Sequence, residues 1–191
     1  MTDVRLDYDR RWVEADPNAT PQAWAATTVR RRWAERQLGD DPARTEAIIA
    51  SVARIVDSID TTALQAALLL YPAADEPVVT VVGLRTFDAA PGLTLDALGD
   101  ELCIPTEMLE VPRDRSVIET PVGPAVRLVQ RYRELLSPGV EEIREHVAYG
   151  WLVSGSDHED VVVTVSTAFV DLVAASTWIT AVDELAQSLT A

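Results

Sequence analysis

The sequence predicts an α+β protein: a mainly antiparallel β-sheet of about six strands, flanked by two N-terminal helices and a C-terminal helix. Three observations predict it. Residues 141–153 and 161–168 alternate between apolar and polar side chains, as half-buried strands do. Residues 48–59 and 178–189 place apolar side chains three and four positions apart, as helices do. Most strands follow one another without an intervening helix, so antiparallel pairing is expected.

Two helices are expected before the sheet. The first begins at Thr20 and Pro21, because threonine is a good N-cap and proline fits the first helical position. It should end near residue 38, before Gly39. The second begins at Asp41-Pro42 with the same signal. Residues 1–19 show no clear period, so we expect an N-terminal arm over 1–19 and a single α+β domain over 20–191.

The strands come from short runs rich in β-branched residues. Residues 61–71 are apolar on both faces, which fits either a central strand or a continued helix. The other expected elements are strands at 78–87, 116–120 and 125–134, a short helix at 94–103 capped by Thr94, tight turns at 120–124 and 135–139, and a long hairpin of 141–153 with 161–168. A helix to residue 189 ends the chain.

Charge and composition exclude several classes of function. The net charge of −15 opposes the phosphates of nucleic acids and of anionic membranes, so we expect neither as a partner. All basic residues are arginine, which is typical of a GC-rich bacterial genome. Cys103 is the single cysteine, so an internal disulfide is excluded. With no apolar signal segment at the N-terminus, we expect a cytoplasmic protein.

No motif for catalysis, a metal or a nucleotide stands out, so we expect no catalytic residues, no metal and no cofactor. The chain lacks Gly-x-Ser-x-Gly and Gly-x-Gly-x-x-Gly. His158 lies among three acidic residues, but consecutive side chains on a loop point apart. Cys103 follows Leu102 and precedes Ile104, which is typical of a small buried apolar residue.

The candidate binding residues are arginines, one histidine and two tryptophans. Arg127, Arg131 and Arg133 are predicted on one face of a strand, with Arg144 opposite them if the next strand pairs antiparallel. They either receive an acidic partner or pair with glutamates across the sheet. His146 is expected on the polar face beside Arg144. The two remaining candidates are Trp24 and Trp33, which would mark a docking surface if exposed and otherwise belong to the core.

Residues 119–128, Glu-Thr-Pro-Val-Gly-Pro-Ala-Val-Arg-Leu, resemble small actinobacterial proteins of the PsbP-like α/β-sandwich type. The resemblance extends over about residues 63–189. It implies a role in binding or assembly rather than in chemistry, and it supplies no catalytic residues.

Three functions therefore stay open. The first is a non-enzymatic, cytoplasmic interaction or assembly module that binds a protein partner through the arginine-bearing sheet face or the N-terminal helices. The second is a small-ligand-binding protein or enzyme with a pocket between sheet and helices, marked by polar groups such as His146 with Arg127. The third is a homo-oligomer that pairs through an edge strand at 78–87 or 161–168.

Overall fold

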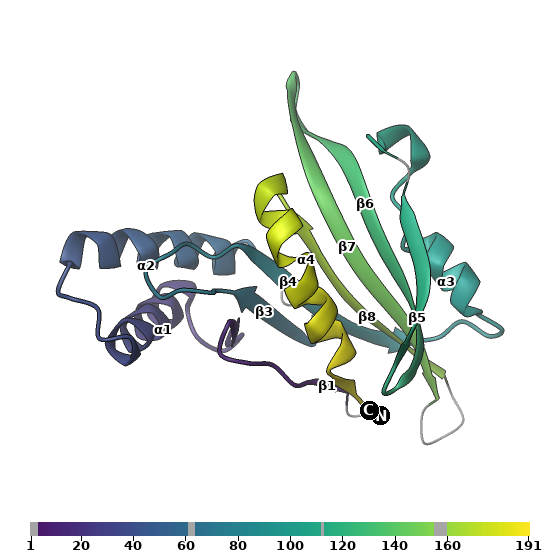
Figure 1. Cartoon of the computed structure of the whole chain (residues 1–191), viewed down its shortest axis with the longest axis horizontal. Coiled ribbons are helices and arrows are strands. Elements are labelled where there is room, and N and C mark those ends of the chain that lie inside the picture. The colour runs from purple at the N-terminus through teal and green to yellow at the C-terminus, as the bar shows by residue number, and fades with distance from the viewer. Residues whose placement is uncertain (1–3, 61–63, 112, 155–159) are drawn as a thin grey trace. The chain divides into compact units, whose positions relative to one another are not determined.

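The computed structural model describes residues 4–60, 64–111, 113–154 and 160–191; His158 lies outside them. The chain divides into two compact units, residues 9–81 and residues 1–8 with 82–191. Helices and antiparallel strands occur in both units, so the predicted α+β class is confirmed (Figure 1). No helix in the described parts of the chain combines the length and apolar character needed to cross a membrane.

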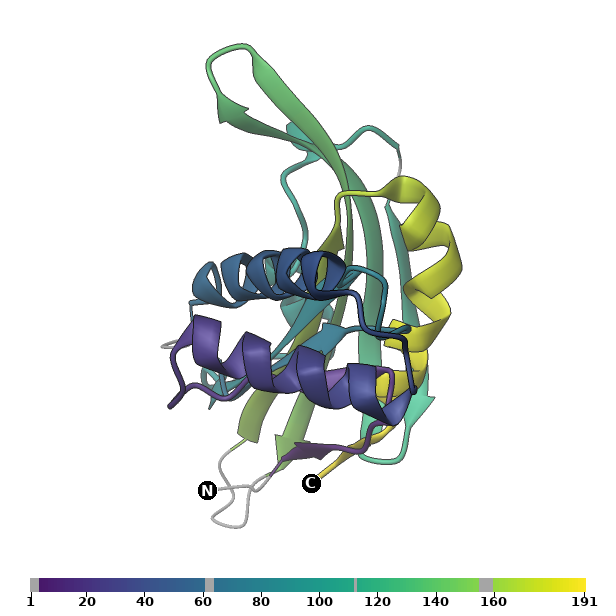
Figure 2. The same cartoon turned by 90° about the vertical axis from the view of Figure 1, so that its left-hand side faces the viewer.

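The unit of residues 9–81 pairs two helices with two strands. Helices α1 (Pro21–Glu35) and α2 (Pro42–Asp57) lie side by side (Figure 2). Strands β2 (Trp12–Glu14) and β3 (Ala66–Leu70) pair antiparallel. Both predicted helix starts are confirmed, because the Thr20 side chain accepts a hydrogen bond from the Ala23 N–H and Asp41 accepts one from the Arg44 N–H. The stretch predicted as an irregular arm thus contains a strand with a buried residue, Trp12.

The core of this unit lies between the helix pair and one side of the strand pair. Its buried members include Val13, Trp24, Val29, Ile49, Val52, Val56, Leu69 and Tyr71. The regular three-four spacing of α2 supplies the largest share of them, as expected for an amphipathic helix.

Arg32 fastens α1 to the strands of the same unit. Its guanidinium donates to the carbonyl of Arg10 at 2.7 Å and to the carbonyl of Tyr71, and it stacks 4.5 Å from the centre of the Tyr71 ring. Burial lowers the pKa of Arg32 and raises the pKa of Tyr71 to about 12. The three successive arginines of α1 point in different directions around the helix: Arg32 points inward, while Arg30 and Arg31 pair with acids at the surface.

The second unit contains a five-stranded antiparallel arrangement. Its strands are β4 (Thr80–Asp88), β5 (Asp114–Thr120), β6 (Gly123–Ser137), β7 (Val140–Ser154) and β8 (Asp160–Phe169), in the spatial order β4-β8-β7-β6-β5. Two short strands, β1 (Arg5–Leu6) and β9 (Leu189–Thr190), pair with each other. The predicted hairpin of 141–153 with 161–168 is confirmed as β7–β8.

The two predicted edge strands are not free edges. Strand β8 lies between β4 and β7, so the prediction that residues 161–168 offer an edge is wrong. Residues 78–87 are engaged at their start, because the Val79 N–H donates to the Leu70 carbonyl at 2.9 Å. A strand that pairs with a neighbour on both edges has no free backbone N–H and C=O groups with which to pair with a second copy of the chain.

The two faces of this sheet are covered by different helices. Helix α3 (Leu95–Glu101), capped by Thr94 as predicted, packs its Leu98 against the face that carries Val126, Leu128 and Ala148. Helix α4 (Leu172–Gln187) lies along the opposite face, which carries Tyr149 (Figure 1). Side chains alternate across a strand, so every second residue of β6 and β7 belongs to each face. A 3-10 turn (Thr106–Met108) and the following residues lead into β5.

Candidate functional site

The end of the β6–β7 hairpin projects beyond the strands that flank it (Figure 2). Strand β7 pairs with β8 only from Glu145 onward, and β6 pairs with β5 only up to Val129. Within the described part of the chain, residues 131–144 therefore pair mainly with each other, apart from a bridge between Leu109 and Tyr132 and a hydrogen bond from the Glu110 N–H to the Arg131 carbonyl at 2.9 Å. The predicted turn at 135–139 is shorter than expected, because β6 continues to Ser137.

We call residues 131–144 the hairpin end. Four large apolar side chains are exposed there. Leu135 is 64% exposed, Val140 50%, Leu136 49% and Ile143 39%. Alternation places Leu135 and Ile143 on the face that α4 covers farther down the sheet. Large exposed apolar side chains at the end of a projecting element are typical of a contact surface.

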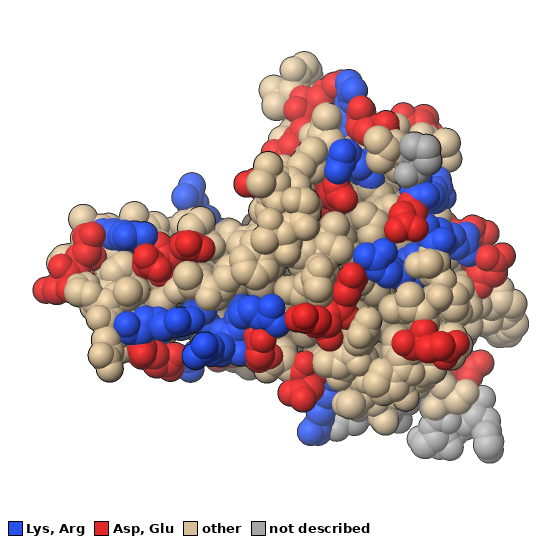
Figure 3. Space-filling view, viewed as in Figure 1, with Lys and Arg blue, Asp and Glu red and all other residues tan. Residues whose placement is uncertain are grey.

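The arginines on this face are already paired with glutamates. Arg131 donates to Glu145 at 2.6 and 3.0 Å, and Arg133 donates to Glu110 at 2.6 Å and to Glu141 at 2.7 Å. The hydrogen bond from Arg133 lowers the pKa of the Glu110 carboxyl. In Figure 3 the basic and acidic atoms are interspersed around the hairpin end, with uncharged atoms at its tip. The cross-strand pairing that the sequence left as one alternative is thus present.

Arg144 does not belong to the same surface as the other arginines. Its backbone partner is Tyr132, on the face opposite Arg131 and Arg133, so the prediction that it lies opposite them is wrong. A one-residue difference in strand register moves a side chain to the other face. Arg144 pairs there with Glu142 at 2.7 Å and with Glu134 at 2.8 Å.

Arg127 lies deeper in the sheet, where α4 covers it. Its guanidinium donates to both carboxylate oxygens of Asp183 at 3.0 and 3.2 Å, and to the hydroxyl of Tyr149 at 3.2 Å. Tyr149 in turn donates to Asp183. A weaker contact of 3.5 Å reaches Asp114. The Arg127 side chain is only 17% exposed, so this group ties α4 to the sheet rather than presenting a charge to a partner.

His146 faces α3, not Arg127. It lies opposite Gln130, whose amide nitrogen is 3.4 Å from Nδ1 of the histidine. The Gln130 side chain also accepts from the Ile104 N–H at 2.9 Å and donates to the Leu102 carbonyl at 3.3 Å. A pocket that combines His146 with Arg127 is therefore excluded, because the two residues occupy opposite faces. Instead, His146 and Gln130 support the segment that follows α3.

Acidification should destabilise the fold through His146. Burial lowers the pKa of its imidazole below the ordinary value of about 6.5. The contribution of His146 to the free energy of unfolding is therefore fully present above pH 6.5. It is lost as the pH falls toward the folded-state pKa, because the histidine of the unfolded chain takes up a proton first. Chemical denaturation between pH 8 and 5 should show this fall, and His146→Gln should flatten it. An unchanged pH profile in the variant would contradict a buried neutral histidine.

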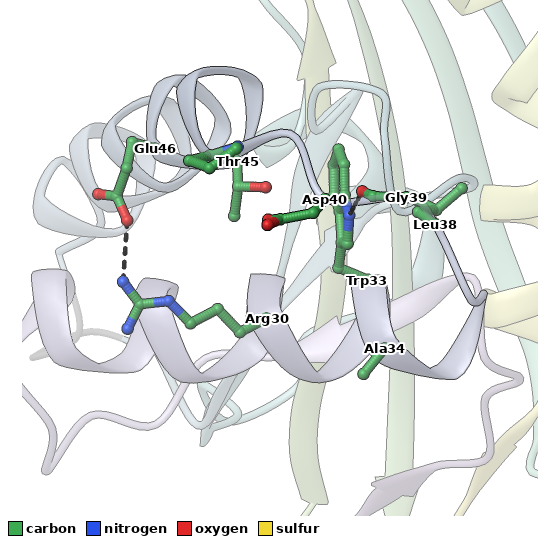
Figure 4. Close-up of a pocket in the computed structure, with 9 residues that line it drawn as sticks. Arg30, Trp33, Ala34, Leu38, Gly39, Asp40, Thr45 and Glu46 are labelled. Atoms are coloured by element: carbon green, nitrogen blue, oxygen red, sulfur yellow. Dashed lines mark hydrogen bonds and ion pairs between the residues drawn. The ribbon is translucent and has the colours of Figure 1, made fainter.

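The two tryptophans have different surroundings. Trp24 is 9% exposed within the core of its unit, so it is not a docking residue. Trp33 is half-buried and borders a hollow of about 470 Å³ between α1, α2 and the segment that joins them (Figure 4). Its indole N–H donates to the Gly39 carbonyl at 3.0 Å. Trp33 thus lies at the edge of a cavity.

Among the residues that the structure describes, no three His, Cys, Asp or Glu side chains gather as metal ligands. The Cys103 thiol donates to the Gly99 carbonyl at 3.1 Å.

The apolar hairpin end was not predicted from the sequence, because Leu135 and Leu136 lie next to the Pro138-Gly139 turn signal. The pair Leu135-Leu136 inside a predicted turn was the signal that could have indicated an exposed apolar surface.

Comparison with known proteins identifies a fold neighbour. No protein-family model matches the chain, and no curated protein matches it. Among solved structures, the crystal structure of LpqN, involved in cell envelope biogenesis of Mycobacterium tuberculosis, is similar with a TM-score of 0.54 and 10% identity over 98% of this chain and 83% of that one. At such low identity the similarity shows the fold alone.

Proposed function

We propose that the protein is a non-enzymatic interaction or assembly module that binds a protein partner through the hairpin end. The observation that carries this proposal is the exposure of Leu135, Leu136, Val140 and Ile143 on a hairpin that extends past its neighbouring strands. Monomeric proteins seldom leave several large apolar side chains together at the surface, and such patches mark contact sites.

The paired charges around the patch support a protein partner. Arg131 and Arg133 already pair with glutamates at the surface, so their charges are balanced before a partner arrives. Fixed ion pairs at the rim of a contact orient the partner, while the apolar centre supplies most of the free energy of binding. This replaces the sequence-based proposal of a free arginine face, because each of these arginines already has an acidic partner.

A capture experiment with matched variants tests the proposal. The tagged protein is used as bait in both cytosolic and envelope fractions of the source cells, beside the variant Leu135→Ser with Ile143→Ser. We expect one stoichiometric partner whose recovery falls at least tenfold with the variant, because two apolar anchors are worth roughly 2 kcal/mol or more. Val117→Ser is the control, since Val117 is 61% exposed on β5, away from the hairpin end.

Two outcomes would contradict the proposal. One is equal recovery of the partner by the wild type, the hairpin-end variant and the Val117→Ser control. The other is a wild-type bait that retains no protein from any fraction. Circular dichroism of each bait ensures that the variants are folded.

We infer further that the protein is actinobacterial and of the PsbP-like type, and that it acts in the cytoplasm. The absence of lysine, with arginine in its place, and the mycobacterial origin of the fold neighbour support an actinobacterial source. The single cysteine supports the cytoplasm. The fold neighbour LpqN, in contrast, is involved in cell envelope biogenesis, which is why both fractions are tested. Light scattering of the purified protein tests the homo-oligomer hypothesis.

A further inference from the structure

We propose that the hollow beside Trp33 is a binding site for a small organic cation, such as a quaternary or alkyl ammonium compound. This site belongs to the unit of residues 9–81 and is independent of the hairpin end. Figure 4 shows its lining, which includes Arg30, Trp33, Leu38, Asp40, Thr45 and Glu46. A volume of about 470 Å³ falls in the usual size range of small-molecule sites.

The charges of the lining favour a cation. Arg30 and Glu46 neutralise each other through a contact of 2.8 Å. Asp40 is exposed and makes no ion pair with any residue in the described parts of the chain, so its carboxylate is available to a ligand at the hollow. A ligand of positive charge would be attracted to it.

The start of α2 does not reverse this preference. A helix N-terminus attracts anions through its free N–H groups. Here the carboxylate of Asp41 already accepts a hydrogen bond from the Arg44 N–H at 3.0 Å and adds a negative charge. Arg44 itself is turned to Asp75, at 3.1 Å. The positive end of the helix is therefore occupied by the protein's own anion.

Trp33 supplies the second part of the recognition. The face of an indole ring attracts cations and is the strongest of the aromatic side chains in this respect. The hydrogen bond from the Trp33 N–H to the Gly39 carbonyl fixes the ring against the residue that precedes Asp40. Figure 4 shows the Asp40 side chain beside this ring. Leu38 and Ala34 add apolar surface for the methyl or alkyl groups of the ligand.

Choline and its neutral isostere 3,3-dimethyl-1-butanol make a direct test. The indole N–H resonance of Trp33 in a ¹⁵N-labelled sample, assigned with Trp33→Phe, reports the binding. We expect a saturable shift with choline, with a dissociation constant on the order of 1 mM, and at least a fivefold weaker response to the neutral isostere. Asp40→Asn should weaken choline binding at least threefold. Asp57→Asn, at the far end of α2, should leave it unchanged.

Three results would overturn the proposal. The first is an equal response to choline and to the isostere, which would make the hollow merely apolar. The second is unchanged choline affinity in a folded Asp40→Asn variant. The third is binding of a lysine- or arginine-bearing peptide more than tenfold tighter than choline, which would assign the hollow to a protein. The hairpin-end variant should bind choline normally, so this site and the proposed function can fail separately.

Discussion

Replacing Asp183 with alanine is expected to lower the free energy of unfolding by about 2–3 kcal/mol. The change leaves the guanidinium of Arg127 beneath α4 with only its weaker 3.5 Å contact to the exposed Asp114, and it leaves the Tyr149 hydroxyl without its acceptor. Removing one partner of a buried ion pair costs about 3–5 kcal/mol, and the remaining exposure of this pair reduces that figure. Urea denaturation followed by fluorescence measures the effect.

Two further variants separate charge from packing at this site. Asp183→Asn keeps an acceptor for Tyr149 but removes the charge, so it should cost less than Asp183→Ala. The double variant Arg127→Met with Asp183→Leu replaces the pair with apolar side chains and should recover part of the lost stability, because no unpaired charge then remains beneath α4, although the buried Tyr149 hydroxyl still lacks its acceptor. A double variant less stable than Asp183→Ala alone would show that the ion pair itself, and not the stranded arginine, is what the fold requires.

Gly150→Val is expected to destabilise the protein by about 3 kcal/mol and to loosen α3. A Cβ atom at Gly150 would come within 2.8 Å of Leu102 and 2.9 Å of Leu98. Both leucines are packed against the sheet, and inserting groups into a filled core costs about 1–3 kcal/mol because side chains must leave their preferred rotamers. Gly150→Ala should show a smaller loss in the same denaturation experiment.

The control for Gly150 is a glycine with space around it. A Cβ atom at Gly39 meets nothing within 4 Å, so Gly39→Ala should change stability little. Combining Gly150→Ala with Leu102→Ala creates room for the new methyl group, so the pair should cost less than the sum of the single changes. Strict additivity would contradict a direct clash between residue 150 and α3.

Local patterns in the sequence were enough to predict most elements. Helix α2 was predicted correctly because its cap at Asp41 and its apolar spacing both act within a few residues. The β7–β8 hairpin followed from alternation alone. No comparable local signal marks β2, because this strand has only three residues and is formed by pairing with the distant β3. The sequence therefore predicted only an arm there.

The candidate sites depended far more on tertiary contacts. The sequence placed Arg127, Arg131 and Arg133 on one face, as observed, because their spacing is local. It could not assign Arg144, since one step of register between β6 and β7 decides its face. Nor could it distinguish the buried Trp24 from Trp33, because both lie on a helix whose apolar stripe is weak and whose neighbours are distant in sequence.

The α+β class, the helix caps and the alternation of the long strands could be predicted, because all of these arise from interactions between residues close together in the chain. Three features emerge only in the folded chain: the pairing of the arginines with glutamates, the exposure of Leu135 and Ile143 at the hairpin end, and the position of Asp40 beside Trp33 at a hollow. Each of these features depends on which distant segments come together and at what register, and no local pattern encodes that choice.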